Sequence, residues 1–475
     1  MISNNYKYLL KNIGILTISN IGSKIFSFIL IPLYTTFLTT LDYGKYDLCY
    51  TTISLFIPIL SLNIVEAVMR YSIEKKYNAS EVFSIGLKYV LRATLILIAL
   101  VALNYYFNII LIIKEEAIYV VILFFLTALY DLFVQYCRGM EKIKELAIAG
   151  FLNTFSMVIF NIVFLMILRL GLDGYFIANC LSYLIPIIYI MYKLKIYGNI
   201  QIKASKKLEK EMLEYSRPMI SNTISWWINN VSDRYVVTYL IGAEANGIYS
   251  IAYKIPSVLN VFQTIFGQAW TISAIKELNE KNYKFYVNIY EVYNCLLVIV
   301  CSCLIIFDKI IAKILFSHQF FEAWKYAPFL MISVVFGGLS GYLGGIFAAT
   351  KNSKLFAKTT TIGAVLNIFL NLILVKVIGT MGAAISTLIA YFVVWILRII
   401  YIKKIINLKF NIKIDLFIYF ILIIQAILLY LEINLIIKYL LQIILLLIIT
   451  VLYRKNIYKA ISKIFKRKEV KDEKK

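Results

Sequence analysis

Hydrophobic residues recur along the chain in runs of about twenty, and short polar stretches separate the runs. A helix of that length crosses the hydrocarbon core of a bilayer. The pattern therefore predicts an all-α polytopic membrane protein with about fourteen transmembrane helices. We expect them at residues 12–36, 46–70, 83–107, 117–138, 146–169, 173–193, 213–240, 247–273, 283–306, 324–349, 356–378, 381–402, 413–431 and 433–452.

The composition excludes the soluble classes of protein. Hydrophobic residues make up 61% of the 475 residues and charged residues only 16%, against about a half and about a quarter in globular proteins. The chain has no nucleotide-binding loop of the G-x-x-x-x-G-K-[ST] type. All six cysteines lie in apolar runs, where they behave as small hydrophobic residues. We expect no cofactor and no metal site.

The positive charge is concentrated on one side of the predicted helices. The formal net charge is +23, and thirty-five of the 49 lysines and arginines fall in the N-terminus, alternate connections and the C-terminal tail, with Arg398 among them. Seven fall on the opposite side. Because cytoplasmic loops carry the excess of Lys and Arg, we predict that both termini are cytoplasmic. We interpret these cations as partners of anionic membrane lipids rather than of nucleic acid.

Three pairs of matching segments indicate an internal repeat. The pattern G-x-Y-x-x-x-Y begins at Gly44 and again at Gly247, 203 residues later. Glycine pairs at 171 and 174 and at 379 and 382 flank equivalent turns, and an Asn precedes a cation by four residues at Lys24 and at Arg234. The repeat unit has six helices, so the two copies share one orientation, as in transporters with parallel repeats.

The repeat predicts two six-helix lobes and two additional C-terminal helices. We expect a first lobe at 1–193, a cytoplasmic linker at 194–212, a second lobe at 213–402, helices thirteen and fourteen at 403–452 and a basic cytoplasmic tail at 453–475. Two such lobes facing a central cavity are able to alternate between inward-open and outward-open states.

The segment Ser225–Tyr235 and its continuation Ile241–Ile255, together with Asp42–Gly44, resemble the oligosaccharide flippases of bacterial polysaccharide biosynthesis. These form the polysaccharide transporter branch of the multidrug/oligosaccharidyl-lipid/polysaccharide exporter superfamily. The resemblance implies transfer of an oligosaccharide on polyprenyl diphosphate from the inner to the outer leaflet of a bacterial cell membrane, alongside polysaccharide biosynthesis enzymes. Lipid II flippases carry an arginine-rich first helix, whereas this chain has only Lys24 there, which disfavours lipid II as the cargo.

Ionisable residues inside membrane helices are costly and usually face a cavity or a partner. Lys24, at mid-span, and Arg234, at the repeat-equivalent position, are candidate cavity cations for a diphosphate; structural pairing with a carboxylate is the alternative. Lys254, seven residues into the eighth predicted helix, is a third candidate because it belongs to the resembling motif, and snorkelling is its alternative. Asp233 is a further candidate, or a pairing partner for another helix.

Four more intramembrane charges enter the candidate set. Glu66 and Arg70 share one face of the second predicted helix, which favours an ion pair between them at the cytoplasmic rim. Both also belong to the candidate substrate contacts. Asp131 and Glu291 are candidate sites for a coupling proton or sodium ion. A buried salt bridge is the alternative for each acid.

Two other functions are also compatible with an apolar chain of this kind. A polysaccharide polymerase or ligase needs catalytic side chains in a sizeable outer loop, and the largest predicted one, about Phe307–Ala323, offers only Asp308, His318 and Glu322. A drug/cation antiporter of the same superfamily would bind cationic substrates, which the three candidate cavity cations disfavour. The sequence therefore favours a flippase that is not an enzyme.

Overall fold

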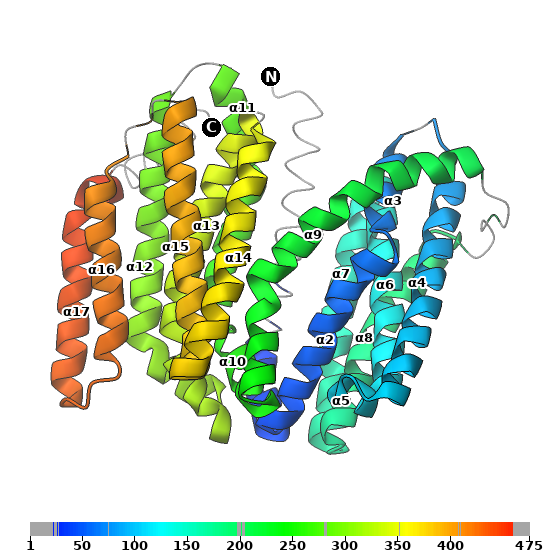
Figure 1. The fold of residues 1–475 in the computed structure, drawn as a ribbon, viewed down its shortest axis with the longest axis horizontal. Coiled ribbons are helices and arrows are strands. Elements are labelled where there is room, and N and C mark those ends of the chain that lie inside the picture. Colours follow the sequence, from blue (N-terminus) through cyan, green and yellow to red (C-terminus); the bar gives the residue numbers. More distant parts are fainter. Residues whose placement is uncertain are drawn as a thin grey trace, which may run out of the picture. The chain divides into compact units, whose positions relative to one another are not determined.

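The computed structural model describes residues 22, 26, 28–74, 76–196, 201, 205–279, 283–350, 352–406, 408 and 410–458. Throughout these ranges the regular structure is helical, without strands (Figure 1). Nine of the described helices are long and apolar enough to span a membrane, and ten if one bent pair counts as a single span. The predicted all-α polytopic class is confirmed.

The described chain divides into two compact units. Unit 1 comprises the residues up to Val231 together with Ala243–Gly247 and Ser317–Gln319. Unit 2 comprises Ser232–Gly242, Ile248–Phe316 and the residues from Phe320 onward. The assignment of predicted helices to two repeated lobes stays a prediction.

Unit 1 is built around α6, which packs against α3, α4 and α8 (Figure 1). Thr39 begins α2 with a capping box, in which its hydroxyl accepts from the Asp42 N–H while the Asp42 carboxylate accepts from the Thr39 N–H. The elements are α2 (Thr40–Leu60), α3 (Ile64–Ile73), α4 (Ala79–Phe107), α5 (Leu111–Glu115), α6 (Ala117–Gly139), α7 (Ile143–Asn161), the π-helix η1 (Ile162–Ile167), α8 (Gly171–Lys193) and α9 (Lys206–Leu240) as far as Val231.

Unit 2 has α13 at its centre, in contact with α11, α12, α15 and α16. The last two helices, α16 and α17, lie side by side and pack on α12 (Figure 1). The elements are α10 (Ala243–Ala252) from Ile248 on, α11 (Ser257–Asn279), α12 (Tyr283–Leu315), the 3-10 helix η3 (His318–Lys325) from Phe320 on, α13 (Ala327–Ala349), α14 (Ser353–Ile378), α15 (Thr380–Ile405), α16 (Ile412–Leu428) and α17 (Leu435–Leu452).

Two predicted helices are broken. The second, expected at 46–70, consists of α2 and α3, which are bent by 59° at the break. The eighth, expected at 247–273, consists of α10 and α11, and Pro256 lies in the intervening turn. Proline removes a backbone donor and clashes with the preceding turn, so Lys254 lies in this turn and not seven residues into a continuous helix.

Two connections are shorter than expected. α12 continues to Leu315, so most of the predicted outer loop Phe307–Ala323 is helical and Asp308 lies inside α12. α9 begins at Lys206, within the stretch expected to be linker. Gly171 and Gly379, which precede or begin the helices after the two repeat-equivalent turns, both have positive φ, at 55° and 64°.

Candidate functional site

A polar cavity of about 480 Å³ lies inside unit 1. Its lining residues belong to the broken helix α2–α3 and to α6, with one residue each from α7, α8 and α9. Two of the acids expected inside the membrane, Glu66 and Asp131, share this cavity. The remaining lining residues are Tyr50, Ile53, Ser54, Ile57, Pro58, Asn63, Val65, Thr127, Tyr130, Val134, Gln135, Arg138, Asn153, Tyr183 and Thr223.

The break between α2 and α3 positions one wall of the cavity. Pro58 lies in the last turn of α2, and Leu62 and Asn63 follow with φ of 54° and 51°, a left-handed conformation that residues other than glycine seldom adopt. The chain turns there and α3 starts at Ile64, which leaves Glu66 in the first turn of the new helix. A carboxylate is favoured at that end by the helix dipole.

Two charged side chains of the cavity, Glu66 and Arg138, are linked through the neutral amide of Gln135. Gln135 donates through Nε2 to Glu66 Oε1 at 3.4 Å, and Arg138 donates through Nη1 to Gln135 Oε1 at 3.4 Å. Arg70 pairs with Glu74, at 3.0 Å, so the expected ion pair between Glu66 and Arg70 is wrong. Glu74 lies one turn further from the break, at the i+4 position that suits a pair with arginine.

The other walls offer aromatic faces and neutral hydrogen-bonding groups. The hydroxyls of Tyr50 and Tyr183 are 3.4 Å apart, and Asn153 donates to the Ser182 carbonyl at 2.9 Å. Trp227 of α9 donates through Nε1 to Ser54 Oγ at 3.1 Å. Hydroxyl and amide groups beside tyrosine rings are able to bind a polyhydroxylated ligand, and the two carboxylates are able to bind a proton or a cation.

A second polar cluster lies in unit 2 around Asp233 of α9. This side chain is 2% exposed, and its carboxylate accepts from the hydroxyls of Tyr249 at 2.7 Å and Tyr253 at 2.6 Å and from the Arg234 backbone N–H at 2.9 Å. The two tyrosines are those of the second G-x-Y-x-x-x-Y motif. Asp233 therefore contacts another helix, which agrees with the expectation that it is a pairing partner.

The cluster extends to α14 and α15. Thr387 donates to Asp233 Oδ2 at 3.4 Å and accepts from Asn367 at 3.2 Å, and Asn371 donates to Asn367 Oδ1 at 3.0 Å. Ser232 donates to the same amide oxygen at 3.3 Å. A buried carboxylate among hydroxyl and amide oxygens from separate helices is a ligand set that suits a proton or a hard cation.

The remaining candidates are dispersed. The Arg234 guanidinium stacks over the Tyr253 ring at 5.2 Å, and Lys254 lies in the turn between α10 and α11. Glu291 lies in α12 within unit 2, and Lys24 lies outside the described residues, as does the tail from residue 459 on. The structure therefore joins Glu66 with Asp131, and Asp233 with Arg234.

Asp415 and Arg398 are among the buried charges that the sequence analysis missed. Asp415 of α16 accepts from Asn294 at 3.0 Å and from the hydroxyls of Tyr290 and Tyr453 at 3.3 Å, and these bonds join α12, α16 and the end of α17. Asp415 is an acid inside the thirteenth predicted helix, and this position alone could have identified it as a candidate intramembrane charge. Arg398, counted as a cytoplasmic loop cation, is 3% exposed and donates to the Ser340 carbonyl and to two threonine hydroxyls.

Two protein-family profiles match overlapping parts of the chain. The profile of the family described as polysaccharide biosynthesis protein matches residues 9–272, just over half of the chain. The profile described as MatE matches residues 218–373.

Individual relatives have low sequence identity to this chain, and each match covers only part of both proteins. The chain is 25% identical over 302 residues to an uncharacterized membrane protein of Methanocaldococcus jannaschii, across 60% of this chain and 58% of the relative. It is 23% identical over 214 residues to the probable low-salt glycan biosynthesis flippase Agl15 of Haloferax volcanii, across 44% of this chain and 45% of that protein. The chain thus spans about half the length of these curated relatives.

The fold is similar to that of a solved transporter. The lipid II flippase MurJ in an inward closed conformation has a TM-score of 0.71 to this structure, covering 94% of this chain and 98% of that chain. The identity is 15%, so the likeness concerns the fold alone.

Proposed function

Because the chain belongs to the polysaccharide biosynthesis protein family, we propose that it is a flippase that moves a lipid-linked oligosaccharide from the inner to the outer leaflet. The family match over residues 9–272 is the observation that carries this proposal. The similarity to a probable glycan biosynthesis flippase and the MurJ-like fold support it. The finer proposal is a polyprenyl diphosphate carrier and a role in cell-surface polysaccharide synthesis.

The proposed transport requires compensation of the diphosphate charge. Carrying at least two negative charges through hydrocarbon costs many kcal/mol, and fixed cations in a hydrated cavity offset that cost. We assign this role to Lys24, Arg234 and Lys254. The stacking of Arg234 on Tyr253 supports this assignment, because it fixes the orientation of the guanidinium.

The saccharide needs a different surface from the diphosphate. The unit 1 cavity combines tyrosine rings with amide, hydroxyl and carboxylate groups, which suits sugar hydroxyls. We propose that Glu66 contacts the saccharide there. Arg70, which pairs with Glu74, acts at the rim of that region.

Energy for directional transport is proposed to come from an ion gradient. Asp131 in the unit 1 cavity and Glu291 in α12 remain the candidate sites for H⁺ or Na⁺, and the Asp233 cluster is a third candidate because its oxygens come from several helices. A carboxylate that faces alternate sides of the membrane is able to take up and release a proton or cation in turn. Asp131→Asn with Glu291→Gln should make transport insensitive to imposed gradients, whereas gradient-driven transport in this double variant would exclude both acids.

The cellular setting follows from the same proposal. We propose that the protein lies in the cell membrane of a bacterium with both termini cytoplasmic. We propose further that it acts with polysaccharide biosynthesis enzymes and has neither an enzymatic activity nor a nucleic-acid partner of its own. The broken helices α2–α3 and α10–α11 support alternating access, because discontinuous helices line the sites of many secondary transporters.

The MatE match over residues 218–373 favours a second candidate, a drug/cation antiporter. The two candidates differ in the sign of the cargo. An antiporter for cationic drugs depends on carboxylates, whereas the proposed flippase depends on cations. Variants that remove a cation and variants that remove a carboxylate therefore distinguish the flippase from the antiporter.

The experiment measures glycan export in cells that depend on this protein. Lys24→Ala and Arg234→Ala should each abolish export while membrane abundance stays unchanged, and Lys24→Arg and Arg234→Lys should retain part of it. Lys403→Ala, an exposed cation at the end of α15, is the matched control and should export normally. Normal export by both alanine variants would contradict the cationic binding site.

A further inference from the structure

A second pocket, of about 430 Å³, lies at the surface of unit 1 between α4 and the first turns of α9. One face of α9 lines it with residues spaced three or four apart, and α4 contributes Lys88. Four of the seven lining residues are cations and two are anions. The lining residues are Lys88, Lys206, Glu209, Lys210, Leu213, Glu214 and Arg217.

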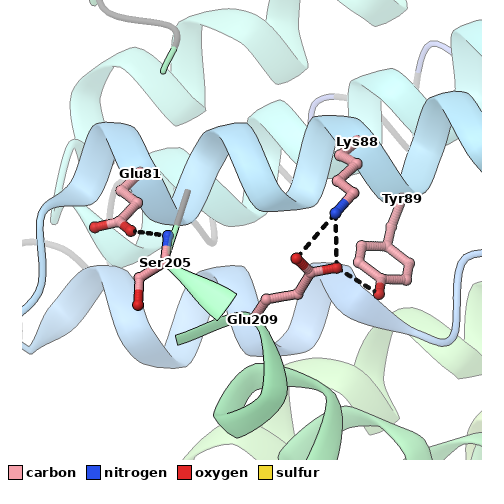
Figure 2. Close-up of polar contacts among 5 residues, drawn as sticks. All are labelled: Glu81, Lys88, Tyr89, Ser205 and Glu209. Atoms are coloured by element: carbon pink, nitrogen blue, oxygen red, sulfur yellow. Dashed lines mark hydrogen bonds and ion pairs between the residues drawn. The ribbon is translucent and has the colours of Figure 1, made fainter. Parts of the chain in front are cut away.

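Hydrogen bonds hold α9 in place beside this pocket. Glu209 accepts from Lys88 Nζ at 2.9 Å and from the Tyr89 hydroxyl at 2.8 Å, and the Ser205 N–H donates to Glu81 at 2.6 Å (Figure 2). Partial burial acts to raise the pKa of the Glu209 carboxyl, but the bonds from Lys88 and Tyr89 outweigh it and lower that pKa below its usual value. The Glu209 carboxylate is therefore ionised, and its oxygens accept hydrogen bonds from Lys88 and Tyr89.

The other cations of the pocket remain available to a ligand. Lys210 approaches Glu214 only to 3.8 Å, and both side chains are largely exposed, so this pair contributes little energy. Arg217 and Lys206 are exposed on the same face of α9. Arg92, one turn beyond Lys88, stacks on Tyr89 at 5.3 Å and adds to the positive potential.

An exposed apolar stripe continues from the pocket along α4. Leu91, Leu95 and Ile98 follow Lys88 at helical spacing on one face and are 46%, 66% and 44% exposed. α4 has 29 residues, about nine more than a span needs. Counted back from the far end of α4, Lys88 falls at the boundary between hydrocarbon and the polar interface.

We propose that this pocket binds the phosphate group of an anionic membrane lipid, with an acyl chain lying along the stripe of α4. A phosphate is the anion that several lysines and an arginine bind well. The apolar stripe beneath the cations favours a lipid over a soluble phosphate, which would gain nothing from it. This site is separate from the unit 1 cavity and does not depend on the transported cargo.

Native mass spectrometry of the purified full chain in detergent measures the binding. The probes are short-chain phosphatidylglycerol, short-chain phosphatidylcholine and inorganic pyrophosphate. Wild-type protein should bind one phosphatidylglycerol at least tenfold more tightly than phosphatidylcholine. The triple variant Lys206→Ala, Lys210→Ala and Arg217→Ala should bind it on the order of 100-fold more weakly, at about fivefold per cation.

A matched triple variant controls for general surface charge. Lys144→Ala, Lys403→Ala and Lys404→Ala remove three exposed cations from the same predicted side of the membrane and should bind phosphatidylglycerol as the wild type does. Should the test variant be unstable, Lys210→Ala alone should weaken binding about fivefold and Lys210→Arg should restore it.

Three results would overturn the proposal. The first is unchanged phosphatidylglycerol binding in the test variant. The second is an equal loss of binding in the test and control variants, which would indicate diffuse attraction to the surface. The third is pyrophosphate binding tighter than lipid binding with the same dependence on the three cations, which would assign the pocket to a soluble anion.

Discussion

Replacing Gly44 by alanine should destabilise unit 1, because the backbones of α2 and the start of α10 approach each other closely at this residue. A Cβ at Gly44 would overlap the backbone carbonyl of Ala243, and a Cβ at Gly247 would overlap that of Thr40, in both cases well within the 3.0 Å that Cβ atoms keep. Asn246 also donates to the Gly44 carbonyl at 3.3 Å. The two glycines that begin the repeated motif therefore face each other.

Gly44→Ala is expected to lower the free energy of unfolding by about 2 kcal/mol. Overpacking costs about 1–3 kcal/mol, and the upper end applies because a helix backbone cannot rotate away as a side chain does. The greater helix propensity of alanine returns up to about 1 kcal/mol. For a unit of this size the loss corresponds to a fall of about 4–8 °C in the unfolding midpoint.

Gly341→Ala in α13 is the matched control. A Cβ at Gly341 meets nothing within 4 Å, so this variant should match the wild type or gain up to about 1 kcal/mol from the same propensity. Both midpoints are measured by thermal unfolding of the purified protein in one detergent. If Gly44→Ala unfolds at the temperature of Gly341→Ala, the close crossing of the two helices is wrong.

Three other variants or fusions test separate parts of the structure. Asp308 is fully buried, and its carboxylate has no hydrogen-bond partner among the described residues. Asp308→Leu should therefore raise the unfolding midpoint, because it removes a buried polar group that makes no hydrogen bond. A lower midpoint would contradict this and indicate that the carboxylate binds a proton or a cation. The lowered pKa of Glu209 means that its ion pair stabilises above about pH 4.3 and is lost as the pH falls through the folded pKa. Glu209→Gln at neutral pH should therefore speed hydrogen exchange in the first turns of α9, and unchanged exchange would refute the anchoring role. Reporter fusions after Lys207 and Lys455 should report a cytoplasmic location and a fusion at Ser317 an external one, whereas an external Lys207 would overturn the predicted topology.

Helix positions could be predicted from the sequence because a membrane span requires a long apolar run, and such runs are visible without any structure. The breaks were harder to place. Pro58 and Pro256 lie at or beside the two breaks, but Pro186 lies in the uninterrupted helix α8. Whether a proline breaks a helix depends on neighbouring packing that can satisfy the freed carbonyl, and a single sequence does not reveal that packing.

The candidate site could be predicted only in part. Asp131 and Glu66 were recognisable because each is an acid within an apolar run, but their common cavity depends on the bend after Pro58. The contact of Asp233 with two motif tyrosines needed the fold, because the residues are 16 and 20 positions apart and lie on different helices. Isolated charges are visible in a sequence, whereas their partners are set by packing between helices.

The most direct test of the proposed function is translocation of a fluorescent lipid-linked oligosaccharide in proteoliposomes, read by a membrane-impermeant quencher. Wild-type protein should exchange the labelled lipid between leaflets, while Lys24→Ala and Arg234→Ala should leave it in its original leaflet and Lys403→Ala should behave as the wild type. Absence of protein-dependent exchange, in vesicles where the same protein transports a cationic drug, would contradict the flippase and establish the antiporter in its place.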